Sequence, residues 1–189
     1  MIGDALIFLV HALCGFFASV LLLRFWMQWC RAATRNPLSL FVQSLTNFAV
    51  LPARRIIPGL WGHDLATLIL AWLTLVVEML LIFLIKGALP ESGAAIGIIL
   101  LAALLMLVRL SIYLAIGVII VQVILSWVNP SSPVMSVVSA LTQPLLRPIQ
   151  RVVPPIGMVD LSSLIALLLL QLILMVPLRY LERALGVAF

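Results

Sequence analysis

The sequence contains very little charge. Only 9% of its 189 residues are Asp, Glu, Lys or Arg, whereas 65% are apolar and the mean hydropathy is +1.32. A water-soluble domain of this size has no interior large enough to hide that much apolar surface. The scarcity of charge therefore excludes a soluble globular fold and predicts an integral membrane protein built from helices.

Residue types that carry catalysis or bind metals are also scarce. The chain has six acidic residues, two histidines and two cysteines. It contains no glycine-rich phosphate loop, no cluster of zinc ligands and no Ser/His/Asp nucleophile set. Cys14 and Cys30 are 16 residues apart in one expected helix, about 24 Å along its axis, which is too far for a disulfide. We therefore expect no enzymatic activity, no metal site and no cofactor.

The net charge of +5 comes from few groups, and no basic tail or patch suggests nucleic acid as a partner. A small positive excess instead bears on membrane orientation and on contact with anionic lipid headgroups. No basic residue precedes the first apolar run, which continues past the length of a signal-peptide core. We expect this run to remain in the bilayer as an anchor.

One stretch of the chain occurs twice. A shift of 96 residues superposes seven identities without a gap: Leu45, Thr46, Pro52, Arg55, Pro58, Asp64 and Leu65 fall on Leu141, Thr142, Pro148, Arg151, Pro154, Asp160 and Leu161. An Asn-Pro pair precedes each copy, at Asn36-Pro37 and at Asn129-Pro130. Because the identities are mostly Pro, Arg and Asp, chance similarity between two apolar sequences explains them poorly. We predict an internal duplication.

Four apolar segments are long enough to cross a bilayer, which takes about 20 helical residues. They cover residues 5–27, 65–85, 98–128 and 161–178. The expected fold is an all-α membrane protein whose four transmembrane helices form two tandem two-helix repeats, residues 1–93 and 94–189, in one integrated membrane domain. The third segment is longer than a straight crossing needs, so either a tilt or a kink is compatible with it.

Each repeat has a more polar connector between its spans, residues 36–63 and 129–159. Apolar residues recur there at helical spacing, in a helix too short and too polar to span, so we expect an amphipathic helix in the membrane interface. In the first connector, Asn36 is the expected N-cap with Pro37 at the first helical position. The repeated prolines are expected to break regular structure after these helices. Whether the connectors lie on the membrane or dip into it stays open.

The first span ends at an aromatic cluster, Phe25, Trp26 and Trp29, with Arg24 and Arg31 alongside. Aromatic rings and snorkelling arginines of this kind mark a membrane interface. The side of the membrane that holds the connectors carries most of the basic residues: Arg31, Arg35, Arg54, Arg55, Arg147 and Arg151. The positive-inside bias predicts cytoplasmic connectors, with both termini outside, in a bacterial inner membrane.

The order of these motifs resembles one family. A duplicated two-span unit with Asn-Pro, Leu-Thr, Pro, Arg, an Ile-Pro or Val-Pro pair and then Asp-Leu at the next helix start is similar to the YggT family, called YlmG in some bacteria. The resemblance covers nearly the whole chain. It implies a non-catalytic membrane protein associated with cell division, osmotic-stress tolerance or the assembly of haem-containing membrane complexes.

The family often has Gly-Gly-x-Asp before the second helix of a repeat. Here the first copy reads Gly62-His63-Asp64 and the second reads Met158-Val159-Asp160. If this turn binds a ligand, its two copies are not equivalent.

Four arginines of the connectors, Arg54, Arg55, Arg147 and Arg151, are candidate contact residues. A guanidinium there suits a lipid phosphate, a carboxylate of a partner protein or the carbonyl end of a helix. Simple anchoring in the interface by snorkelling is the ordinary alternative. Asp64 precedes a span, where a carboxylate caps the helix and can pair with Arg55, and we expect the same of Asp160 and Arg151.

Three polar residues lie inside the expected spans: His11, Glu78 and Arg109. An isolated charge at mid-bilayer costs at least about 3 kcal/mol, so these residues should find partners. We expect an ion pair between Glu78 and Arg109 that joins the two repeats. A proton or ion relay is the functional alternative. Haem ligation by His11 has little support, because neither a second axial ligand nor a Cys-x-x-Cys-His motif is evident.

Two functional hypotheses follow. In the first, the protein is a non-catalytic scaffold or assembly factor whose connectors and arginines contact another membrane or membrane-associated complex, with a homo-oligomer also possible. In the second, it is a small ion or solute channel or transporter that uses Glu78, Arg109 and His11. A weaker third possibility is that the interfacial helices sense lipid packing.

Overall fold

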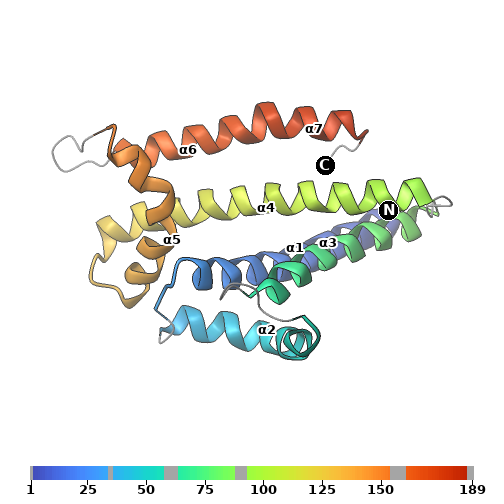
Figure 1. Cartoon of the computed structure of the whole chain (residues 1–189), viewed down its shortest axis with the longest axis horizontal. Coiled ribbons are helices and arrows are strands. Elements are labelled where there is room, and N and C mark those ends of the chain that lie inside the picture. Colours follow the sequence, from blue (N-terminus) through green and yellow to red (C-terminus); the bar gives the residue numbers. More distant parts are fainter. Residues whose placement is uncertain (1, 34–35, 58–63, 88–92, 154–160, 187–189) are drawn as a thin grey trace.

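A computed structural model describes residues 2–33, 36–57, 64–87, 93–153 and 161–186 of the chain. Every regular element within those ranges is helical (Figure 1). In chain order the elements are α1 (Ile2–Trp29), α2 (Pro37–Ile56), α3 (Leu65–Lys86), α4 (Gly93–Val128), α5 (Pro133–Gln150), α6 (Leu161–Ile173), the π-helical turn η1 (Leu174–Leu178) and α7 (Arg179–Ala184).

Four helices are long and apolar enough to cross a membrane: Ile2–Trp29, Leu65–Lys86, Ala95–Val128 and Leu161–Ala184. Only 22–28% of the residues in their most apolar windows are buried inside the protein. The remaining apolar surface has lipid as its natural surrounding. Each of the four predicted spans lies within one of these helices, and the chain is a multi-pass helical membrane protein.

The last span is longer than predicted. The sequence places its end at residue 178, before Arg179 and Glu182, but the helix continues to Ala184. Five residues of π-helix, Leu174–Leu178, surround Pro177 within it. Proline has no N–H to donate, and a π-helical turn changes the hydrogen-bond pattern locally so that the helix can continue past it. Glu182 is buried in this extension.

The first connector helix, α2, begins at a well-formed cap. The side chain of Asn36 accepts a hydrogen bond from the backbone N–H of Ser39, with Pro37 as the first helical residue. The helix then continues through Pro52 to Ile56, and α5 likewise continues through Pro148 to Gln150. The expectation that these two prolines break the helices is wrong. Each proline removes its own N–H from the helix, and the hydrogen bonds of the neighbouring residues carry the helix past it to its end.

The second connector helix, α5, begins three residues later than the Asn-Pro pattern predicts. Its N-cap is Ser132, whose hydroxyl accepts from the N–H of Val134 at 3.3 Å, with Pro133 in the first turn. Asn129 instead belongs to the preceding turn, in which its carbonyl accepts from the N–H of Ser132. Ser132-Pro133 follows Asn36-Pro37 by 96 residues, the same shift that superposes the other motifs. The corrected helix start also places Pro130 before the helix.

The spans α1, α3 and α4 pack side by side, and α6 lies on the far side of α4 (Figure 1). The start of α1 and the end of α7 lie toward the same end of the molecule, and α5 crosses the opposite end (Figure 1). Helix α2 instead turns back beside α1: the ring of Phe17 stacks on that of Phe48 with centroids 5.5 Å apart. The two connector helices therefore take different positions relative to their spans.

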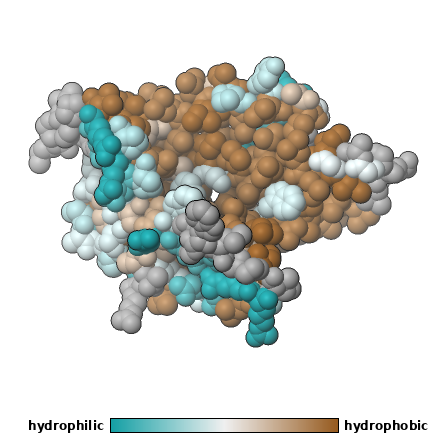
Figure 2. Space-filling model, in the orientation of Figure 1, coloured by the Kyte–Doolittle hydropathy of each residue, from teal (hydrophilic) through white to brown (hydrophobic). Residues whose placement is uncertain are grey.

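The main core lies among α1, α3 and α4. Its fully buried residues include Leu21 of α1, Leu75 of α3 and Ala102 of α4, and Val50 of α2 packs against them. A smaller cluster of Ile119, Leu146 and Ala166 joins α4, α5 and α6. Figure 2 shows apolar surface over the spans, with hydrophilic surface gathered around the connector helices. Polar side chains therefore lie mainly between packed helices or on the connector helices.

Candidate functional site

Two pairs of ionisable side chains link spans within the membrane-crossing part. Nδ1 of His11 in α1 lies 2.6 Å from Oε1 of Glu78 in α3, and Glu78 is completely buried. Arg109 in α4 donates from Nη2 to Oε2 of Glu182 in α7 at 3.1 Å.

The predicted ion pair between Glu78 and Arg109 is therefore wrong. Glu78 faces the neighbouring helix of its own half, and the partner of Arg109 comes from a segment that the sequence placed outside the spans. Depth along a helix, which the sequence indicates, does not determine the direction in which a side chain points around the axis.

Two cavities flank Arg109. One of about 300 Å³ is lined by His11, Arg109 and Tyr113 together with apolar residues. The other, of about 260 Å³, is lined by Arg109 and Tyr113 again, with Gln171 and Arg179 among its remaining residues. Polar side chains of α1, of α4 and of the last span therefore line the two cavities beside Arg109.

A second polar group lies where α2 packs on α1. Arg24 is buried, and its Nη1 donates to Oγ1 of Thr46 at 2.6 Å and to Oδ1 of Asn47 at 2.9 Å. The sequence pattern suggested that Arg24 snorkels to the interface. It instead turns inward, because α2 folds back beside α1 and supplies the two acceptors.

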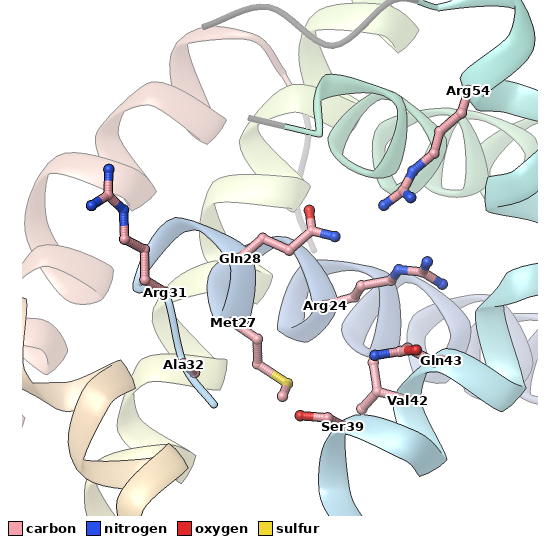
Figure 3. Close-up of a pocket in the computed structure, with 9 residues that line it drawn as sticks. All are labelled: Arg24, Met27, Gln28, Arg31, Ala32, Ser39, Val42, Gln43 and Arg54. Atoms are coloured by element: carbon pink, nitrogen blue, oxygen red, sulfur yellow. The ribbon is translucent and has the colours of Figure 1, made fainter. Parts of the chain in front are cut away.

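A cavity of about 460 Å³ adjoins Arg24 and is lined by Gln28, Arg31, Gln43 and Arg54 among others. Figure 3 shows the amide of Gln28 and the guanidinium groups of Arg24 and Arg54 directed to one side of this cavity, whereas the guanidinium of Arg31 lies on the other side of Gln28. Three arginines and two amides line one space, with no Asp or Glu among its lining residues.

Arg54 joins the end of α2 to the start of α3. Its Nε and Nη2 donate to Oδ2 of Asp64 at 3.0 and 2.5 Å, and the hydroxyl of Thr67 donates to the same oxygen. The pairing expected for Asp64 was with Arg55, one residue and about 100° further around the helix. Asp64 does occupy the N-cap position of α3, but its side chain makes no capping hydrogen bond, and the backbone N–H of Thr67 donates instead to the carbonyl of Asp64 at 3.2 Å.

The contacts of Asp64 affect its titration. Burial by itself raises the pKa of the Asp64 carboxyl, but the hydrogen bonds from Arg54 and Thr67 and the positive charge of Arg54 outweigh burial. The pKa of Asp64 consequently lies below its ordinary value, and the group is ionised at neutral pH.

The remaining connector arginines point outward. Arg55, Arg147 and Arg151 are exposed, and their side chains make no hydrogen bond or ion pair within the described ranges. Pro58, Pro154, Asp160 and Arg35 lie outside the described residues, as does the expected pairing of Asp160 with Arg151.

The repeated threonines are both buried but bond differently. Oγ1 of Thr46 donates to the carbonyl of Val42 and accepts from Arg24. Oγ1 of Thr142 bonds only carbonyls of its own helix, those of Val138 and Ser139. A direct link between a span and its connector through this position is thus a property of the first half.

The chain has clear relatives among known proteins. The sequence profile of the CCB3/YggT family matches residues 3–85 and residues 101–181. The uncharacterized protein YggT of Escherichia coli K12 is 37% identical over 171 residues, which cover 90% of this chain and 87% of that protein. An uncharacterized protein encoded in the proC 3' region of Vibrio alginolyticus is 36% identical over 169 residues, or 89% and 90% of the two chains.

A third relative, an uncharacterized protein of Pseudomonas aeruginosa, is 37% identical over 190 residues, which cover 98% of this chain and 95% of that protein. No solved structure matches the chain. Since the family profile covers both halves and the relatives align over most of their own lengths, this multi-pass helical membrane protein belongs to the CCB3/YggT family.

Proposed function

We propose that the protein is a non-catalytic membrane scaffold or assembly factor. The surfaces that α2 and α5 expose dock acidic groups of another membrane or membrane-associated complex. The observation that carries this proposal is the set of outward-pointing arginines at the connectors, Arg55, Arg147 and Arg151, which have no acceptor within the described part of the chain. Charge-assisted hydrogen bonds to carboxylates are the contacts that such groups form best.

The proposal includes a duplicated architecture. The family profile matches once in each half, and the 96-residue shift superposes the caps Asn36 and Ser132 as well as the motifs. These observations support two tandem repeats, residues 1–93 and 94–189. The connectors of both would face the same side, which the positive-inside bias makes cytoplasmic in a bacterial inner membrane. Cell division, osmotic-stress tolerance and assembly of membrane complexes are the processes in which we expect the scaffold to act.

The test is crosslinking in living cells followed by purification in mild detergent and mass spectrometry. Wild type is compared with a variant that carries Arg55→Ala, Arg147→Ala and Arg151→Ala. We expect the wild type to crosslink reproducibly to a defined complex, and the triple variant to lose that crosslink while inserting at a normal level.

A matched control removes basic groups near the ends of α3 and α7, away from the connector helices. Lys86→Ala with Arg183→Ala changes two exposed basic side chains there, and this variant should retain the crosslink. If the wild type captures only copies of itself, or if both variants lose the same proteins, the scaffold proposal is abandoned.

A second function has its own supporting observation. Arg109 and Tyr113 line both intramembrane cavities, and His11 lines one of them. A small channel or transporter could use such a series of polar groups to move a proton or an ion. The variant Glu78→Gln, reconstituted in liposomes, separates transport from a structural role. Loss of flux in a variant that still folds supports transport. If the wild type itself shows no flux and the variant is only destabilised, Glu78 serves as a structural link.

A further inference from the structure

The first observation is a buried cation that no described carboxylate contacts directly. Arg24 is 6% exposed, and its only hydrogen bonds, to Thr46 and Asn47, go to neutral oxygens. Among the described residues, no carboxylate lies within ion-pair distance of it. Burying an ionised group without an opposite charge is unfavourable. The fold therefore leaves an arginine that an anion would stabilise.

The second observation is the space beside it. The cavity of about 460 Å³ that Arg24 lines also receives Gln28, Gln43 and Arg54. The Nη1 atom of Arg24 is used by α2, and Nε is buried without a partner. Nη2 donates to no described residue and is not among the buried atoms. It is thus the donor that remains for a ligand, next to the amide and guanidinium groups shown in Figure 3.

The third observation concerns the backbone at the rim. Arg31 is the one non-glycine residue of the described chain with positive φ, at 51°. Its N–H donates to the carbonyl of Gln28 and that of Ala32 to Met27, which closes α1 with a turn in which glycine is the usual residue. This strained backbone holds Arg31 among the residues that line the cavity, with its guanidinium on the other side of Gln28 from those of Arg24 and Arg54 (Figure 3).

From these observations we infer that the cavity between α1 and α2 is a binding site for a phosphate-bearing anion. Nη2 of Arg24 is the central donor, the amides of Gln28 and Gln43 bind further oxygens, and Arg31 closes the rim. A phosphate oxygen suits guanidinium donors because its charge strengthens each hydrogen bond. The site does not depend on the proposed scaffold, since Arg24 and Arg31 take no part in that surface. The phosphate can belong to a lipid headgroup or to a free anion.

The principal variant is Arg24→Gln, and its matched control is Arg55→Gln on an exposed arginine of α2. In the lipid arm, purified protein is reconstituted with equal amounts of phosphatidylglycerol and phosphatidylcholine and washed, and the retained lipid is counted by native mass spectrometry. In the soluble arm, the melting temperature in neutral detergent is measured with inorganic phosphate against chloride at equal ionic strength.

We expect Arg24→Gln to weaken binding at least about tenfold, the usual effect of losing a hydrogen bond to a charged group, and Arg55→Gln to change it less than about twofold. Loss of phosphatidylglycerol alone assigns the ligand as a lipid headgroup. Loss of the phosphate-dependent stabilisation alone assigns a free anion. If Arg24→Gln and Arg55→Gln behave alike in both arms, the site does not exist.

Arg31→Gly covers the case in which Arg24→Gln fails to fold. Glycine is ordinary at φ 51°, so this change relaxes the backbone while it removes one guanidinium. We expect weaker binding together with an unchanged or raised melting temperature. A purely structural role of Arg31 predicts instead that binding stays at the wild-type level, and that result would overturn the assignment for the rim.

Discussion

The two halves of the molecule make the same kind of link with different residues. In the first half a base on α1, His11, pairs with an acid on α3, Glu78; in the second a base on α4, Arg109, pairs with an acid on α7, Glu182. A shift of 98 residues superposes His11 on Arg109, and also Trp29 on Trp127.

The acids of the two pairs do not correspond. The 96-residue shift places Glu78 on Leu174, whereas Glu182 corresponds to Lys86, eight residues or about two helical turns further along. Because residues two turns apart share one face of a helix, the acid can move by that distance and still face the base. Each half therefore contains an acid–base link between its own two spans, although the residues that form the link differ.

The connectors differ more than the spans. Arg24 links α1 to α2 through Thr46, while the 98-residue shift places the neutral Gln122 at its counterpart in α4. The side-chain oxygen of Gln122 is buried without a hydrogen bond. Helix α2 turns back beside α1, whereas α5 crosses the end of the spans (Figure 1). The contact that Arg24 makes with Thr46 thus has no counterpart between Gln122 and Thr142 in the described part of the second half.

The largest expected effect comes from breaking the two intramembrane pairs separately. Glu182→Gln removes the carboxylate that pairs with Arg109, whose side chain is only 16% exposed, and should lower the free energy of unfolding by about 3 kcal/mol. Glu78→Gln should cost only about 1 kcal/mol, because the amide of the new Gln can still form a hydrogen bond with the imidazole of His11. Unfolding by dodecyl sulfate in mixed maltoside micelles measures both. Equal losses would show that the two pairs are electrostatically alike.

Exchange of the repeated threonines for the isosteric valine tests the connectors. Thr46→Val deprives Arg24 of an acceptor and should cost about 2 kcal/mol, the range for a hydrogen bond to a charged group. Thr142→Val removes only a bond to its own helix and should cost less than about 0.5 kcal/mol. The same micelle titration reports both values. A larger loss for Thr142→Val than for Thr46→Val contradicts the role assigned to Arg24.

The helix caps provide a smaller difference. Asn36→Ala removes a buried cap and should cost about 1.5 kcal/mol, and Ser132→Ala, with its longer hydrogen bond, about 0.5 kcal/mol. Asn129→Ala should have no measurable effect, because α5 begins after it. Thermal unfolding followed by circular dichroism compares the three. If Asn129→Ala is more harmful than Ser132→Ala, the start of α5 at Pro133 is incorrect.

The smallest expected effect is the pH dependence of the ion pair between Arg54 and Asp64. The pKa of Asp64 is lower in the folded protein than in the unfolded chain, so its stabilising contribution is complete above the unfolded pKa and is lost as the pH falls through the folded pKa. Because the Arg54 side chain is 41% exposed, the contribution should stay below about 1 kcal/mol.

Melting temperatures between pH 6 and pH 3 measure this contribution. Asp64→Asn and Arg54→Gln should each reduce the acid-induced decrease, and Arg55→Gln, which leaves the pair intact, serves as the control. A decrease that is unchanged in Asp64→Asn assigns the pH dependence to other carboxyl groups.

Several features of the fold follow from the sequence because their causes are local. Runs of about 20 apolar residues predict spans wherever they lie in the tertiary structure, and all four predicted spans are present. Asn36 followed by Pro37 predicts the start of α2 from the chemistry of the first turn, whereas the same pair at Asn129-Pro130 lies three residues before the cap of α5. The end of the last span was misjudged because Glu182 suggests a water-exposed position until its partner on α4 is known.

The candidate sites depended on contacts between helices that the sequence does not specify. The sequence indicated that His11, Glu78 and Arg109 lie inside the membrane and need partners. The two acid–base pairings, Glu78 with Arg109 and Glu78 with His11, differ only in how the helices are rotated about their axes. Likewise, Arg24 satisfies the pattern of a snorkelling residue, and only the return of α2 beside α1 turns it inward.

The sequence by itself thus determined which segments are helices and spans, because apolar burial and helix capping act over one or two turns of chain. The tertiary structure decided which charges meet, since the partners are 67 residues apart for His11 and Glu78 and 73 for Arg109 and Glu182. A hydrogen bond requires two atoms to approach within about 3 Å, and that distance is set by the packing and rotation of whole helices.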